Sequence, residues 1–160
     1  MILNCPLRPF AAVLCASLIA GVASAQTIKV GVIACFTGPF AQWGEQWKRV
    51  IALYQEQNGA KVGADEIEIL YRDERGTDPA IPKRLAEELV IQDKVDVIAG
   101  FTLTPSALAV ADVITEAKMP TVIFNAATHF VVRKSPQFVR MSATLDSAIV
   151  PIVAKSISPL

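Results

Sequence analysis

The stretch VDVIA, Val95–Ala99, decides the fold of this chain. Its apolar residues do not alternate cleanly with polar ones, and that pattern is typical of a strand covered by helices on both faces. The stretch leads through a loop, Gly100–Ser106, into a helical pattern that we expect over Pro105–Ala117. A buried strand that passes through a loop into a helix is the repeating unit of a parallel sheet.

The same order of strand and helix extends in both directions along the chain. Further strands are expected at Thr27–Ile33, Glu66–Arg72, Thr121–Phe124 and Phe138–Met141, and further helices at Trp43–Gln57, Pro79–Gln92 and Asp146–Ser156. Asp78 stands where a helix N-cap belongs, and Asn58-Gly59 stands where a helix ends most easily. The alternation predicts a doubly wound α/β domain.

The first residues have the pattern of a secretory signal peptide. Arg8 precedes an apolar run, Phe10–Val22, and Ala23-Ser24-Ala25 is the small-residue pattern that signal peptidase recognises. The run is shorter than the about 20 apolar residues that a membrane span needs. We therefore expect cleavage after Ala25 and a mature protein in the periplasm.

The composition excludes several classes of function. The formal net charge is zero and the basic residues are spread along the chain, so no electrostatic footprint for nucleic acid exists. His129 is the only histidine, and Cys35 is the only cysteine after residue 25, so neither a zinc site nor a disulfide is expected. Cys35 follows an apolar strand and is expected to be a small buried hydrophobe.

Ligands of open α/β sheets bind at the loops that follow the carboxyl ends of the strands. Three loops fit this description: Ala34–Gly44, Gly100–Ser106 and Asn125–His129. None has the glycine spacing of a phosphate-binding loop, so no nucleotide cofactor is expected. Thr104-Pro105 suits either a helix cap or a carboxylate site at a helix N-terminus, and the sequence leaves both open. The same alternatives hold for Ala126–Thr128.

Two aromatic residues stand at the loops, and their role is ambiguous. Trp43 and Trp47 share a helical face; Trp47 is expected in the core, whereas Trp43, at the mouth of its loop, can also close over a ligand. Phe101 has the same ambiguity. No catalytic arrangement is expected, because His129 has no acidic neighbour in sequence and the acids over Asp73–Asp78 are those of a solvated loop.

Several motifs occur together in the order of one known family. They are Ile28–Val32, Thr37–Gly44 (TGPFAQWG), Tyr71–Asp73 followed by Asp78-Pro79, Leu85–Val90 (LAEELV), Lys94–Gly100 (KVDVIAG) and Asn125–Thr128 (NAAT). With them, the chain from Thr27 to about Ile157 resembles the leucine/isoleucine/valine-type periplasmic substrate-binding proteins of ABC transporters.

The resemblance implies a type I periplasmic-binding-protein-like fold, in which two α/β lobes close on a ligand. This chain would hold the first lobe, incomplete. In that family, loops that match Thr104 and Ala126–Thr128 hold the charged groups of the ligand, and an aromatic at the position of Trp43 flanks the side-chain pocket. The ligand-binding set expected here is Trp43, Phe101, Thr102, Thr104, Ala126, Ala127 and Thr128. The implied partners are a small-molecule ligand and an ABC transporter permease, and a monomer without cofactor or metal is expected.

The second loop departs from the common pattern of the family. Many members have a run of serines where this chain has Leu103–Ser106, and Gly100–Asp112 is more similar to a branch associated with aromatic carboxylic acids. A ligand without an α-ammonium group needs fewer hydrogen-bond acceptors in this lobe. Leucine-like amino acids and benzoate-like acids therefore remain competing ligands, and the loop favours the acids.

The resemblance also divides the chain. Residues 1–25 are the expected signal peptide, residues 26–141 the N-terminal lobe, and residues 142–160 the start of a second, truncated lobe, which leaves apolar surface exposed. The alternative is an independent small α/β enzyme or signalling domain, whose activity would depend on His129 or on the acids over Asp73–Asp78.

Overall fold

A computed structural model describes residues 25–157 of the chain. The expected signal peptide, apart from its last residue, lies outside the described residues. No helix in the described part is long and apolar enough to cross a membrane.

A six-stranded sheet forms the centre of the molecule, in the order β2-β3-β1-β4-β5-β6. Every neighbouring pair is parallel except β2 and β3. The strands are β1 (Thr27–Ala34), β2 (Lys61–Val62), β3 (Asp65–Asp73), β4 (Val97–Gly100), β5 (Thr121–Ile123) and β6 (Phe138–Arg140). All expected strands are present, and β2 is an addition of two residues that the hydrophobic pattern did not indicate.

The order of the strands reverses at β1, which pairs with β3 on one side and with β4 on the other. Chain connections on the two sides of such a point leave in opposite directions, and a crevice opens outside the strand ends. The predicted doubly wound parallel sheet is thus confirmed, and its switch point lies between the ends of β1 and β4.

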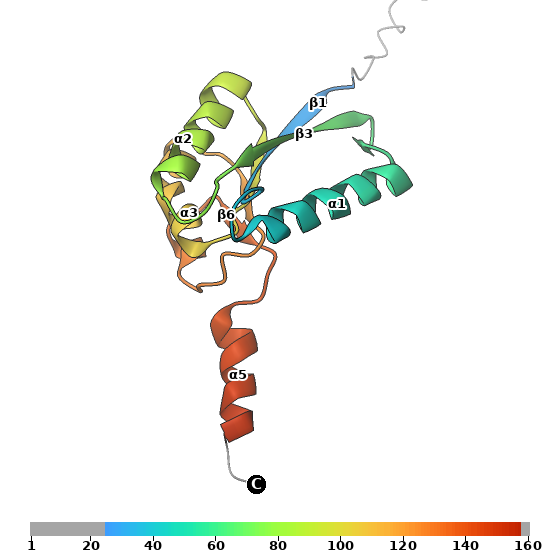
Figure 1. Ribbon diagram of the computed structural model, residues 1–160. Helices are drawn as coiled ribbons and strands as arrows, with labels where there is room; N and C mark the ends of the chain where they lie inside the picture. Colours follow the sequence, from blue (N-terminus) through green and yellow to red (C-terminus); the bar gives the residue numbers. More distant parts are fainter. Residues whose placement is uncertain (1–24, 158–160) are drawn as a thin grey trace, which may run out of the picture.

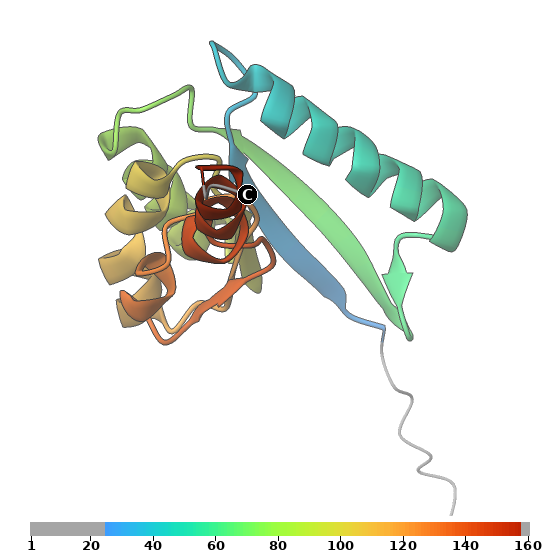
Figure 2. The ribbon, with the colours of Figure 1, turned by 90° about the horizontal axis from the view of Figure 1, so that it is seen from below.

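Helices cover the two faces of the sheet unequally (Figures 1 and 2). The long helix α1 (Ala41–Asn58) lies alone on one face, and α2 (Ala80–Glu88), which continues as the π-helical turn η1 (Leu89–Asp93), lies on the other with α3 (Thr104–Ala109) and α4 (Ala111–Ala117). The single helix expected over Pro105–Ala117 is therefore two helices. Helix α5 (Leu145–Ile157) projects away from the sheet, beyond the short 3-10 turn η2 (Val131–Arg133).

The hydrophobic core lies on the side of α2, α3 and α4. It includes Ile33, Leu89, Ile98, Ile114 and Ile123, each 0% exposed. On the other face, Gly44 is the only buried residue that the described α1 contributes. Trp47, expected in the core, is half-buried instead and packs edge-to-face on Phe124, with ring centroids 5.1 Å apart.

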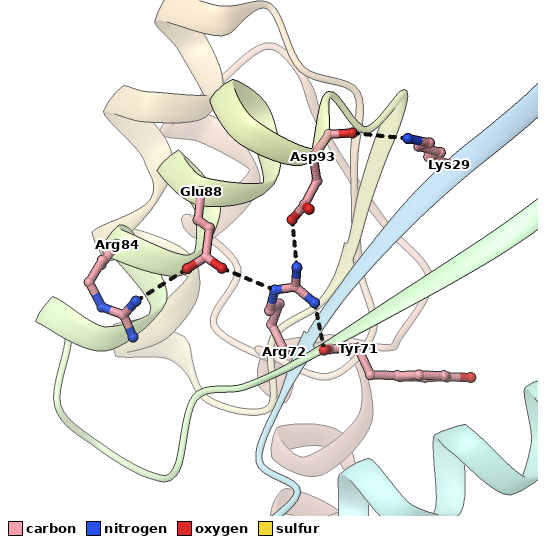
Figure 3. A network of polar contacts seen from close by, with 6 residues as sticks. All are labelled: Lys29, Tyr71, Arg72, Arg84, Glu88 and Asp93. Atoms are coloured by element: carbon pink, nitrogen blue, oxygen red, sulfur yellow. Dashed lines mark hydrogen bonds and ion pairs between the residues drawn. The ribbon is translucent and has the colours of Figure 1, made fainter.

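A polar network connects α2 and η1 to strands β3 and β1 of the sheet (Figure 3). Arg72 on β3 pairs with Asp93 at 2.6 Å and with Glu88 at 3.7 Å. Arg84 reaches the same Glu88 at 3.2 Å, and Lys29 donates to the Asp93 carbonyl. The Arg72 and Asp93 side chains are about one-quarter exposed, so the network orients α2 more than it stabilises the fold.

Candidate functional site

The loops expected to bind a ligand do meet, at the carboxyl ends of β1, β3, β4 and β5. Gly100 and Phe101 make the turn after β4, with φ of 116° and 65°. A side chain at Gly100 would overlap the carbonyl oxygen of Ile33, so the close approach of β4 and β1 requires glycine here. The Phe101 amide donates to the same Ile33 carbonyl at 2.7 Å, which fixes the loop against β1.

Two threonine hydroxyls come together between the second and third loops. Thr104 Oγ1 and Thr128 Oγ1 are 2.8 Å apart, and both residues are half-buried. Helix α3 begins at Thr104, its N-cap residue is Leu103, and no side chain caps it. The capping role left open for Thr104 is therefore absent, and its hydroxyl faces the neighbouring loop. This pair offers at least one O–H that the two threonines do not need for each other.

Arg140 at the end of β6 lies beneath the third loop. Its guanidinium donates to the carbonyl of Thr128 at 2.6 Å and, in a short contact, to the carbonyl of Ala126. Its Nε is buried and has no hydrogen-bond partner among the described residues. Burial lowers the pKa of Arg140 from its usual value, but a guanidinium stays charged at neutral pH. Sequence reasoning missed Arg140, which stands at the penultimate position of the expected strand Phe138–Met141.

Thr102 holds three loops together. Its amide donates to Glu74 Oε1 at 3.0 Å, its hydroxyl accepts from the Cys35 amide at 3.1 Å, and its carbonyl accepts from the Asn125 side chain at 2.9 Å. The residue is 1% exposed. Thr102 was expected to contact a ligand, and in the structure its amide, hydroxyl and carbonyl groups all make hydrogen bonds within the protein.

Glu74 overturns the expectation of a solvated acidic loop. It is 0% exposed, and its Oε1 also accepts a hydrogen bond from Cys35 Sγ at 3.4 Å. Burial raises the pKa of Glu74 above its usual value, although interactions with Ser106, Thr102 and Cys35 act in the opposite direction. Nothing in the sequence distinguishes Glu74 from its acidic neighbours, because only the tertiary fold decides which of them turns inward.

Asp73, one residue earlier, organises the first loop. Its carboxylate accepts hydrogen bonds from the Thr37 hydroxyl at 2.6 Å and from the Phe36 and Arg75 amides at 2.9 Å. Partial burial acts to raise the pKa of Asp73, but these hydrogen bonds outweigh it and hold the pKa below its usual value. Asp73 is therefore charged at neutral pH and engaged with the backbone.

The aromatic residues have separate positions. Trp43, in the first turn of α1, is 38% exposed at the edge of the loops. Phe101 was expected to line a ligand pocket. In the structure its ring is 0% exposed and belongs to the hydrophobic core. Its carbonyl accepts from the Ala126 amide at 3.3 Å. Ala126 is buried and Ala127 half-buried, and the Ala127 carbonyl accepts from Leu145 at the start of α5.

His129 has an acidic partner that the sequence did not reveal. Its Nδ1 lies 2.8 Å from Asp146 Oδ2 on α5, and the two side chains are half or more exposed. The residues are 17 positions apart in sequence, so a search of neighbouring positions could not find the pair. Within residues 25–157 no cluster of three metal-binding side chains occurs.

An open, mainly parallel α/β sheet with its loops gathered at the switch point defines the class of small-molecule-binding α/β lobes. Within that class, the chain belongs to the periplasmic binding protein family, whose model matches residues 27–158. It is 46% identical over 136 residues to the Leu/Ile/Val-binding protein homolog 6 of Brucella abortus (strain 2308), covering 85% of this chain and 35% of that protein. The chain thus spans about a third of the length of the curated relatives it matches.

Solved structures extend the comparison. A solute-binding protein of an ABC transporter from R. palustris, in complex with 4-hydroxybenzoate, is 46% identical with a TM-score of 0.77, covering 81% of this chain and 36% of that one. A second, from Rhodopseudomonas palustris BisB5 in complex with 3,4-dihydroxybenzoic acid, is 44% identical with a TM-score of 0.72, covering 74% and 32%. The leucine-binding protein LivK of Thermotoga maritima, at 23% identity and a TM-score of 0.67 over 73% and 33%, shares the fold.

Proposed function

We propose that this chain is the ligand-binding first lobe of an extracytoplasmic solute-binding protein, and that its ligand is a hydroxybenzoate-type aromatic acid. The Thr104 and Thr128 hydroxyls would hold the ligand carboxylate, with Ala126 and Ala127 allowing a close approach of the backbone. Trp43 would flank the ring. The partner would be an ABC transporter permease, and a signal peptide cleaved after Ala25 would deliver the complete solute-binding protein to the periplasm as a monomer.

One observation carries the preference for an acid over an amino acid. The carbonyl groups of Ala126 and Thr128, which could accept hydrogen bonds from an α-ammonium group, each already accept one from the Arg140 guanidinium, which leaves one lone pair on each oxygen. The same guanidinium places a positive charge beneath the loop, which attracts a carboxylate and repels an ammonium group. Asp73 is engaged with backbone amides and Glu74 is buried, so neither is placed to pair with the ammonium.

Two solved structures of similar proteins support the same preference, although the curated relative at 46% identity is named a Leu/Ile/Val-binding protein homolog. The relatives from R. palustris that are 46% and 44% identical were solved with 4-hydroxybenzoate and 3,4-dihydroxybenzoic acid. The isoleucine complex of LivJ from Streptococcus pneumoniae is 21% identical, which shows a common fold only. A shared preference for aromatic acids is therefore the simpler inference.

The affinity of a single lobe follows from the energy of a complete site. A micromolar ligand corresponds to about −8 kcal/mol, and if the lobe contributes half, about −4 kcal/mol or millimolar affinity remains. We expect this chain to bind 4-hydroxybenzoate with a millimolar Kd and leucine more weakly. Amide chemical shifts recorded during titration with each compound measure both constants.

Two variants test the assignment of the site. Thr104→Val and Thr128→Val keep the side-chain shape and remove the hydroxyls, and each should weaken 4-hydroxybenzoate binding by about tenfold. Thr115→Val removes a hydroxyl on α4 that donates to the Ala111 carbonyl and to the Ser135 hydroxyl, and it should leave Kd unchanged. Equal or tighter binding of leucine would contradict the ligand class, and indifference of both threonine variants would contradict the site.

A further inference from the structure

We infer that Glu74 is the positioning residue of the ligand site, because its buried carboxyl holds the first and second loops in their binding arrangement. The inference rests on the proposed function for its ligand and deepens it by naming what keeps the site in shape. Glu74 itself does not reach solvent, as its exposure of 0% shows. It would act through Thr102 and Cys35.

The contacts of Glu74 form a closed set. Its Oε1 accepts the Thr102 amide at 3.0 Å and the Cys35 thiol at 3.4 Å, and the Cys35 amide in turn donates to the Thr102 hydroxyl at 3.1 Å. One oxygen atom therefore joins the ends of β1 and β4 at the switch point of the sheet. Asn125 adds the third loop through the Thr102 carbonyl.

The placement of Thr102 explains why this set matters for binding. Thr104, whose hydroxyl meets that of Thr128, follows only two residues after Thr102. The turn that carries it contains Phe101 with φ of 65°, which is an uncommon conformation for a bulky residue and needs support from its surroundings. Loss of the Glu74 acceptor would release the Thr102 amide and let this turn relax, which would move Thr104 away from Thr128.

The second carboxyl oxygen of Glu74 indicates which side chain could replace the glutamate at this position. Glu74 Oε2 is buried and has no hydrogen-bond partner within the described part of the chain. Thr102 and Cys35 both donate to Oε1, and a carboxamide supplies the same acceptor. Glu74→Gln should rescue the function that Glu74→Ala loses.

The experiment compares wild type with four variants by amide chemical shifts, hydrogen exchange and titration with 4-hydroxybenzoate. Glu74→Ala should weaken binding by at least about tenfold and speed exchange of the Thr102 amide by at least about tenfold, whereas Glu74→Gln should stay within about threefold of wild type in both. Ile114→Ala leaves a cavity in the core away from the loops and controls for lost stability. Glu68→Ala removes an exposed acid from β3, the strand that ends directly before Glu74, and controls for charge.

Each result has a defined meaning. Binding by Glu74→Ala at wild-type strength, or equal loss in Glu74→Gln, would overturn the inference, and so would an equal loss in Ile114→Ala at matched stability. If wild type binds neither 4-hydroxybenzoate nor leucine, the proposed function fails. The Thr102 exchange rates then decide the positioning role separately, because faster exchange in Glu74→Ala than in Ile114→Ala supports it and equal exchange rejects it.

Discussion

At the residue scale, Arg140 sets the charge that the ligand loops present. Its guanidinium donates hydrogen bonds to the carbonyl groups of Ala126 and Thr128. A positive charge therefore lies beneath the loop that could receive an ammonium group. Arg140→Met should therefore weaken 4-hydroxybenzoate binding by about tenfold and should not weaken leucine binding. Arg133→Met, which removes an exposed cation from η2, is the matched control. Parallel titrations of both compounds would show a uniform loss if Arg140 acted only on folding.

The carboxyl group of Glu74 links stability to pH. Its pKa is raised by burial above the value in the unfolded chain, and the titratable group in contact with it is Cys35. The stabilising contribution of a raised pKa is complete below the unfolded pKa of about 4.3 and is lost as pH rises through the folded pKa. Relative to Glu74→Gln, the free energy of unfolding of wild type should thus fall as pH rises above about 4.5. Urea denaturation across pH 4–8 measures this, and a difference that is constant with pH would contradict it.

Cys35 should be chemically inert in the folded protein. Burial, and next the negative charge of Glu74, raise the pKa of its thiol to about 12. At pH 8 only about one thiol in ten thousand is then ionised, and the side chain is 0% exposed. A thiol reagent such as dithionitrobenzoate should react at the rate of unfolding and immediately in 6 M guanidinium chloride. Rapid labelling of the native protein would show that the strand end opens.

At the scale of elements, the approach of β4 to β1 depends on Gly100. Its φ of 116° and the nearby Ile33 carbonyl both exclude a side chain. Gly100→Ala should cost at least about 3 kcal/mol of unfolding free energy, since steric overlap is added to backbone strain. Gly63 in the turn between β2 and β3 has a φ of 62° with no atom within 4 Å, so Gly63→Ala should cost only about 1 kcal/mol. Equal losses of unfolding free energy in Gly100→Ala and Gly63→Ala, measured by thermal or urea denaturation, would contradict the steric overlap at Gly100.

The sequence predicts elements well where periodicity carries the signal. All strands of more than two residues were expected, and α1 and α5 differ from expectation by one or two residues at each end. The break at Val110 between α3 and α4 was not expected, because Ala107–Ala111 has no glycine or proline to mark it. Strand β2 was missed because two residues are too short for an alternation to be visible.

The candidate site was predicted less completely, for a physical reason. Thr104 and Thr128 could be identified as hydroxyls in loops after strands, and the structure brings them together. Glu74 and Arg140 could not be identified from the sequence, because whether a charged residue turns inward depends on partners distant in sequence. The partner is Thr102 for Glu74 and Ala126 for Arg140. Trp47 was expected in the core and is half-buried, whereas Phe101 was expected at the pocket and is fully buried. The reason is similar, because an apolar pattern indicates which face of an element is apolar and not what covers that face.

At the scale of the whole molecule, the side of the sheet that bears α1 is apolar and open. A groove of about 350 Å³ is lined by Trp47, Val50, Ile51, Phe124 and Met141, and Val50 and Met141 are 65% and 73% exposed. The chain by itself should therefore self-associate through this side at micromolar concentrations. Val50→Lys and Met141→Lys should each shift it toward monomer in sedimentation velocity. Ile91→Lys on η1, 69% exposed outside the groove, should not. A wild type that sediments as a monomer at all concentrations would contradict the prediction.

The central position of β1 also has a consequence for synthesis. The strand is complete at Ala34, but its neighbours begin at Asp65 and Val97. At roughly 5–20 residues per second, the growing chain carries β1 without its β4 partner for several seconds. Stalled nascent chains that end before β4 should therefore remain sensitive to protease within β1, and chains extended beyond β5 should become resistant. The strand that is made first thus waits longest for its second partner, and a chaperone that binds nascent chains has its longest opportunity there.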